Sequence, residues 1–133
     1  MLLVPSYLGR RVACSQSSTS SEGITVTASG STHTKGSWGA TPLWASTPFD
    51  AAGIMVMIGG MGTASTNIKG LCDIGIGGSG SEVVLIPNLM CGSSGTWVGV
   101  MNGGVFYYFP VMIPAATRVN ARIQANTASD TAT

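Results

Sequence analysis

The stretch that decides the fold is "LCDIGIGGSGSEVVLIPNLM", residues 71–90. Its glycines Gly75, Gly77 and Gly80 have the G-x-G-x-x-G spacing of a dinucleotide-binding turn. Such a turn holds a pyrophosphate only where the glycines follow a strand and open a helix. The stretch therefore presents a choice between a nucleotide-binding enzyme and an all-β chain in which the glycines form a turn.

The residues after the last glycine favour a strand. Val83, Val84, Leu85 and Ile86 are consecutive apolar residues, and three of them are β-branched, which is typical of strands. Pro87 would end a helix almost as soon as it began. No acidic residue lies about 20 positions further on, where a ribose-binding carboxylate is expected. We interpret the motif as a glycine-rich turn between two strands, with positive φ where the turn requires it.

Working outward, short apolar or alternating segments recur between Gly, Pro and Ser turns, and no segment has a helical period of useful length. This pattern predicts an all-β fold, specifically an antiparallel, jelly-roll-like β-sandwich with seven to eight short strands. The predicted domain spans 23–133, after an N-terminal arm and Ser-rich link over 1–22. Residues 126–133 are expected to begin one more strand or a linker. The expected strands are 24–28, 36–46, 53–60, 68–76, 81–87, 96–101, 104–114 and 117–125.

Alternation is clearest in residues 117–125, where Val119, Ala121 and Ile123 are expected to face the core. The opposite face of this strand forms a polar stripe and a candidate contact with a partner, although exposed ion pairs contribute only about 0–1 kcal/mol. The residues of the stripe are Arg118, Asn120, Arg122 and Gln124.

The segment "VFYYFP", residues 105–110, places aromatic side chains on both faces of another expected strand. Phe106 and Tyr108 point one way, and Tyr107 and Phe109 point the other. We expect both pairs to be buried on the two faces of a covered strand, with one pair in the core and the other at a surface available for an interface, a sugar or a peptide as the alternative.

Charged residues make up 8% of the chain, against about 25% in an average protein. The formal net charge of +1 provides no basic field for nucleic acid. A surface with so little charge repulsion favours association, so we expect a homo-oligomer, a trimer, with apolar and Ser/Thr side chains in the contact.

Three cysteines, an odd number without a C-x-x-C motif, argue against a disulfide framework and a structural zinc site. Cys72 and Cys91 lie in apolar surroundings and are predicted to be core residues. The cysteine content is typical of a protein that folds in a reducing cytoplasm.

Residues that could carry catalysis are few. His33 is the single histidine and lies in a polar, loop-like stretch, and no G-x-S-x-G elbow is present. Asp73 and Glu82 flank the glycine turn and could meet across a hairpin as paired carboxylates. The structural interpretation is favoured, with Asp73 accepting turn N–H groups and Glu82 pairing with an arginine. We therefore predict a protein that is not an enzyme and has no catalytic residues, cofactor or metal site.

The N-terminal arm, residues 1–11, is too apolar to remain exposed to water. Its arginines follow its apolar part, whereas the basic residues of a signal peptide precede the apolar part. The sequence contains no run of 18 apolar residues, so it predicts no membrane-spanning helix. We expect the arm to dock on a neighbouring subunit or an underlying shell, burying its apolar side chains and presenting its arginines to acidic groups. The candidate interface residues of the arm are Leu2, Leu3, Val4, Tyr7, Leu8, Arg10 and Arg11.

Three stretches within residues 27–130 resemble small β-rich structural proteins of tailed bacteriophages. They contain "TKGSW", "DIGIGGSGSEVVLIPNL" and "YYFPVMIPAATRVNAR". The resemblance implies a β-sandwich module of the virion, folded in the host cytoplasm, that decorates or cements the capsid surface through contacts with its own copies and with the major capsid protein. The alternative is a tail-fibre or tail-tip module that acts in host attachment among other tail proteins. Neither role involves nucleic acid or a membrane.

Overall fold

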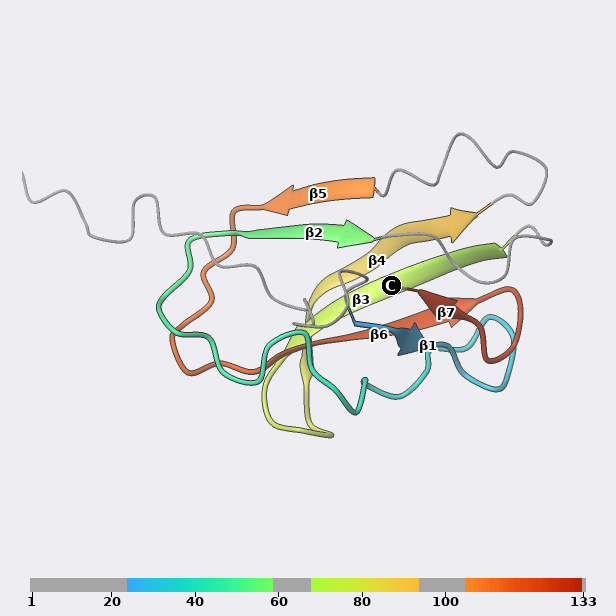
Figure 1. Ribbon diagram of the computed structural model, residues 1–133, viewed down its shortest axis with the longest axis horizontal. Helices are drawn as coiled ribbons and strands as arrows, with labels where there is room; N and C mark the ends of the chain where they lie inside the picture. Colours follow the sequence, from blue (N-terminus) through green and yellow to red (C-terminus); the bar gives the residue numbers. More distant parts are fainter. Residues whose placement is uncertain (1–23, 59–67, 94–104, 133) are drawn as a thin grey trace, which may run out of the picture.

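The computed structural model describes residues 24–58, 68–93 and 105–132. In these ranges the chain is all-β, with no helix and with antiparallel pairing throughout, as the sequence predicts. Seven strands form three small sheets (Figure 1). They are β1 Val26–Thr27, β2 Ile54–Ile58, β3 Ile68–Ile76, β4 Val83–Ser93, β5 Val105–Phe109, β6 Val119–Ala125 and β7 Thr131–Ala132.

The largest sheet has the order β4-β3-β6 and is built around the opening stretch. The glycine-rich segment between β3 and β4 is a tight turn, in which Gly77 and Gly80 have φ of 128° and 79°. Such positive φ values favour glycine, which has no Cβ. The turn leads into a strand and not into a helix, so the spacing of the glycines serves a hairpin and the structural interpretation of the motif is confirmed.

β4 continues beyond Pro87, where the sequence predicted that it would end. Pairing with β3 is interrupted between Cys72 and Ile74, so that Pro87 and Asn88 form a bulge. Asn88 adopts a φ of 57°, and its backbone N–H donates to the Asp73 carboxylate at 2.9 Å. Because β4 lies at the edge of its sheet, the absence of a proline N–H is tolerated.

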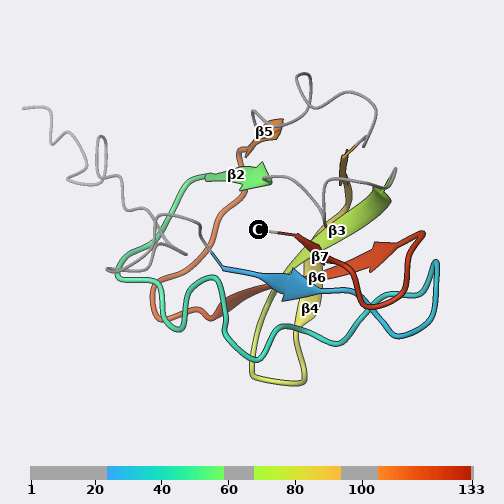
Figure 2. The ribbon, with the colours of Figure 1, turned by 45° about the vertical axis from the view of Figure 1, so that its right-hand side comes forward.

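The other two sheets are two-stranded, β1–β7 and β2–β5. β2–β5 lies above the three-stranded sheet in Figure 2, and side chains from all three sheets contribute to one hydrophobic core. β6 supplies Val119, Ala121 and Ile123 to that core, as their alternation predicts. β7, in the segment where a further strand or a linker was expected, pairs with β1 in the same chain.

The prediction of a strand over 36–46 is wrong. This segment follows the edge of β6 through separate hydrogen bonds, such as Gly39 N to Ala121 O, and forms only an isolated bridge at Trp44. Its glycines and Pro42 interrupt the regular ladder. The expected strand 96–101 lies outside the described residues, as does the arm and link over 1–22.

Candidate functional site

Two surfaces are candidates for function. The first is a polar cluster on the face of β3 and β6 that points away from the core. The second is the solvent-facing side of the β2–β5 ribbon. We define the polar cluster as Lys35, Trp38, Asp73, Glu82, Arg118, Asn120 and Arg122.

Asp73 is the centre of one half of the polar cluster. Its carboxylate is 4% exposed and accepts hydrogen bonds from Lys35 Nζ at 2.7 Å and Arg122 Nε at 3.0 Å. Arg122 lies directly opposite on β6. Lys35 adjoins the irregular segment that follows the edge of β6, and we call residues 35–46 the covering segment. Lys35 Nζ also donates to Leu71 O. Burial raises the pKa of the Asp73 carboxyl, but the hydrogen bonds from Lys35, the Asn88 backbone and Arg122 hold that pKa below its ordinary value.

Glu82 is the centre of the other half. Its side chain is fully buried, and Oε1 accepts from Asn120 Nδ2 at 2.9 Å and from Arg118 Nε at 3.3 Å. Asn120 Nδ2 also donates to Gly39 O at 2.9 Å, which ties the covering segment to β6. Burial raises the pKa of the Glu82 carboxyl, and hydrogen bonds led by that of Asn120 lower it below its ordinary value.

Trp38 connects the covering segment to the sheet. The guanidinium of Arg122 lies 4.7 Å from the centre of the indole ring, a cation–π contact. On the sheet, Gly75 lies so close to the ring that a Cβ there would come within 2.4 Å of Trp38. A glycine is therefore required at this position for packing, although Gly75 does not have a positive φ.

A hollow of about 300 Å³ lies beside the polar cluster, lined in part by Trp38, Gly39, Gly80 and Glu82. The second carboxylate oxygen of Glu82, Oε2, has no hydrogen-bond partner among the described residues, but less than 1 Å² of it is exposed. A molecule in the hollow would therefore not reach this oxygen. The polar cluster is suited to holding the covering segment in place, and its ionised carboxylates are engaged by cations and amides.

The predicted pairing of Glu82 with an arginine is confirmed, since Glu82 binds Arg118. Asp73 was expected to accept N–H groups of the turn, but the backbone N–H it accepts is that of Asn88, which lies in the bulge of β4 and not in the glycine-rich turn. Asp73 also forms ion pairs with Lys35 and Arg122 that the sequence did not indicate. Lys35 lies 38 positions from Asp73 in an irregular segment, and Arg122 was expected to face a partner. The two carboxylates bind separate sets of partners and do not act as a pair.

The remaining reactive side chains occupy the predicted environments. Cys72 and Cys91 are buried free thiols, and desolvation raises the pKa of Cys72 to about 12 and that of Cys91 to about 11, which disfavours the nucleophilic thiolate. His33 is exposed in a turn with a φ of 57°. Among the described residues no three His, Cys, Asp or Glu side chains gather in a way that could hold a metal ion.

The candidate interface residues fall into two groups. Those of the arm, from Leu2 to Arg11, lie outside the described residues. Arg118 and Arg122 are largely buried, with side chains 17% and 28% exposed, and pair with acidic groups of their own chain. A role for these two arginines in binding a partner remains a prediction.

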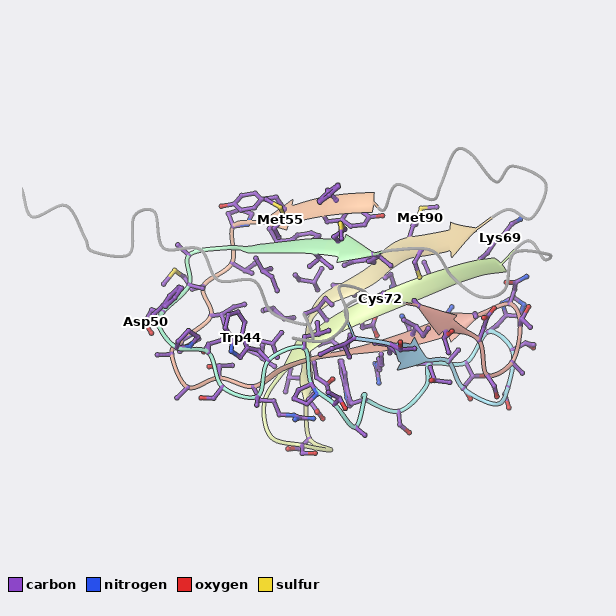
Figure 3. The ribbon with its side chains drawn as sticks, viewed as in Figure 1. Trp44, Asp50, Met55, Lys69, Cys72 and Met90 are labelled. Atoms are coloured by element: carbon purple, nitrogen blue, oxygen red, sulfur yellow. The ribbon has the colours of Figure 1, made fainter. Side chains whose placement is uncertain are left out.

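The second surface was only half anticipated from the sequence. Tyr107 and Phe109 pack against the core, whereas Phe106 and Tyr108 are exposed. The expected burial of both aromatic pairs is therefore wrong, and the alternative, with one pair at the surface, is what the structure shows. On β2, Met55 and Met57 are exposed beside them; Figure 3 shows Met55 on this ribbon. We call these four side chains, Met55, Met57, Phe106 and Tyr108, the outer face. The fully apolar sequence of β2 gave no signal for which of its sides would be exposed.

No family model, curated protein or solved structure matches this chain. Within the described ranges there is no helix of the length and hydrophobicity that crossing a membrane requires. The strands and their pairing place the described residues in the all-β class, with antiparallel sheets.

Proposed function

We propose that the chain is a non-enzymatic structural protein of a tailed-bacteriophage virion, which decorates or cements the capsid surface. The observation that carries this proposal is the distribution of charge. Lys35, Asp73, Glu82, Arg118 and Arg122 form ion pairs within the chain, while the outer face presents large apolar side chains to solvent. Charged side chains that pair within their own chain, together with an exposed apolar surface, are features of a subunit whose surface is buried against neighbouring subunits.

The chemistry of the polar cluster supports a structural role over catalysis. A general acid or base needs a pKa near the working pH, whereas the pKa values of Asp73 and Glu82 are lowered and both carboxylates are held by internal partners. The raised pKa values of the two buried thiols disfavour a cysteine nucleophile for the same reason.

The proposed partners are further copies of the chain and the major capsid protein, and the arm over residues 1–11 is the proposed anchor. Folding in the host cytoplasm precedes assembly into the virion in this proposal. The resemblance of residues 27–130 to phage structural proteins supports the virion setting.

A tail-fibre or tail-tip module is the second candidate. The exposed aromatic rings of Phe106 and Tyr108 favour it, because such rings bind sugars and peptides at host surfaces. The two roles differ in copy number, since a decoration protein occurs hundreds of times in a particle and a tail component a few to a few dozen times.

An incorporation experiment tests the proposal. The full chain is supplied to particles produced without it, alongside a variant that lacks residues 1–11. We expect the full chain to purify with the particles and the truncated chain to remain folded but unbound. Incorporation of the truncated chain at full occupancy would remove the arm as the anchor, and failure of the full chain to join any particle would contradict the virion role.

Changing Arg10 and Arg11 together to alanine is the matched variant of the arm. It should weaken attachment and make it less sensitive to salt, because it removes only the charges. Arg118 and Arg122 are unsuitable controls, because each is paired with a buried carboxylate of its own chain and its loss would disturb the fold.

A further inference from the structure

The outer face combines high exposure with an absence of charge. Met55, Met57, Phe106 and Tyr108 are 69%, 60%, 63% and 65% exposed, and neither β2 nor β5 contains a charged residue. Together these side chains expose on the order of 500 Å² per chain. That area is at the upper end of the largest apolar patch on a typical monomer, which is often functional.

The register of the ribbon sorts the four side chains into two rows. Met55 is paired with Tyr108, and Met57 is paired with Phe106. One row, on β2, is therefore thioether, and the other, on β5, is aromatic. Sulfur–aromatic contacts are favourable and adapt to small differences in geometry, so the two rows are chemically complementary to each other.

We propose that the outer face binds the outer face of a second copy of this chain, related by a two-fold axis that runs along the strands. A rotation about such an axis places β2 of one copy over β5 of the other. Because paired residues lie at the same level along the strands, it also places Met55 over Tyr108 and Met57 over Phe106 of the second copy. Two sheets stacked in this way lie about 10 Å apart with their strands nearly aligned.

The area fits a pair of copies. Burial of both outer faces removes on the order of 1,000 Å² from water, the lower limit for a specific interface. The contact is isologous, so each residue is used twice and the association closes at two copies. It deepens the proposed function by naming the surface of self-association, and it predicts pairs in place of the trimer expected from the sequence.

Other occupants fit less well. A strongly charged partner would meet no opposite charge on β2 or β5. Addition of a strand to the edge of β4 is hindered by Pro87 and the adjoining bulge, which blunt that edge. A second copy matches the outer face in charge, in area and in the pairing of its two rows.

Sedimentation equilibrium of the purified full chain over a range of concentrations tests the contact. We expect a monomer–dimer equilibrium with a Kd on the order of micromolar. Met57→Glu should raise the Kd at least tenfold, because a carboxylate would be buried against Phe106 of the other copy. The matched control is Val83→Glu, at a position of β4 that is 69% exposed and lies outside the outer face, and it should leave the Kd unchanged.

A cross-linking measurement keeps the test informative if Met57→Glu does not fold, as judged by circular dichroism. In a Cys14→Ser background, Met57→Cys chains are mixed with Phe106→Cys chains and treated with a bifunctional thiol reagent that spans the roughly 10 Å between stacked sheets. We expect more covalent dimers in the mixture than in either variant alone, because residue 57 of one copy lies directly over residue 106 of the other. A wild-type chain that stays monomeric or sediments as a trimer, or mixtures that do not cross-link, would overturn the proposal and assign the outer face to another occupant, such as the arm or a particle protein. The particle experiment is independent of this result, because the purified chain is used here.

Discussion

The three glycines of the G-x-G-x-x-G spacing have two different structural roles, and the contact between Gly75 and Trp38 explains the first. Gly75 belongs to a G-x-G-x-x-G spacing, yet it lies inside β3 and contacts an indole ring. The two later glycines form the turn, where their positive φ is required. The spacing alone does not distinguish a turn between two strands from a nucleotide-binding turn before a helix. The β-branched residues that follow the last glycine favour the strand.

Changing Gly75 to alanine should destabilise the protein. The added Cβ would lie 2.4 Å from Trp38, so the indole must move away from β3 and from Arg122. We expect the free energy of unfolding to fall by about 1–3 kcal/mol, measured by urea denaturation followed by tryptophan fluorescence. Gly30→Ala is the control, because nothing lies within 4 Å of its added Cβ. Equal stability of the two variants would show that Trp38 does not pack on Gly75.

At the scale of elements, the ion pairs join the covering segment to β3 and β6. The lowered pKa values of Asp73 and Glu82 link this connection to pH. Both folded-state pKa values lie below those of the unfolded chain, so the unfolded chain binds more protons in the acid range. The stabilisation is therefore complete above the unfolded pKa values and is lost as the pH falls through the folded ones.

We accordingly expect the urea midpoint to decrease between about pH 5 and pH 3. Asp73→Asn should lower stability at neutral pH by about 2–4 kcal/mol, because Lys35 and Arg122 lose a buried partner, and should flatten the acid dependence. Asp50→Asn, at an exposed position, should retain that dependence. An acid profile of Asp73→Asn identical in slope to that of the wild type would contradict the role assigned to this carboxylate.

The elements differ in how far the sequence predicts them. β3 has the predicted bounds, and in β6 the alternation of Val119, Ala121 and Ile123 with polar residues identifies the core side. The same alternation also suggested that the polar side would be open to solvent, yet Asn120 is 1% exposed. The covering segment that buries it is held by long-range contacts, such as that between Asn120 and Gly39, which lie 81 positions apart in sequence. Local patterns do not encode such contacts.

In the candidate site, too, some contacts could be predicted from the sequence and others depend on tertiary packing. Pairing of Glu82 with an arginine was predictable from composition and from the two strands that flank the turn. The choice of Lys35 as a partner of Asp73 depends on the path of an irregular segment, and the outer face depends on which side of an all-apolar strand packs inward. Both are decided by tertiary packing, which overrides local preference.

At the scale of the whole molecule, five charged side chains of the described residues form internal ion pairs, and the outer face of the β2–β5 ribbon is exposed. A protein with this surface is prone to associate at neutral pH, since little charge opposes contact. Association is a defect in a monomeric enzyme and a function in a coat subunit. The exposed outer face and its two rows of side chains support the proposed role in assembly.

The number of copies of this chain in an intact particle tests the proposed role most directly. Quantitative mass spectrometry of purified virions, with the major capsid protein as the internal standard, provides that number. A capsid decoration protein predicts hundreds of copies in each particle, in a fixed ratio to the major capsid protein. A count of a few to a few dozen would contradict decoration of the capsid and favour the tail, and the absence of the chain from purified particles would contradict a structural role in the virion altogether.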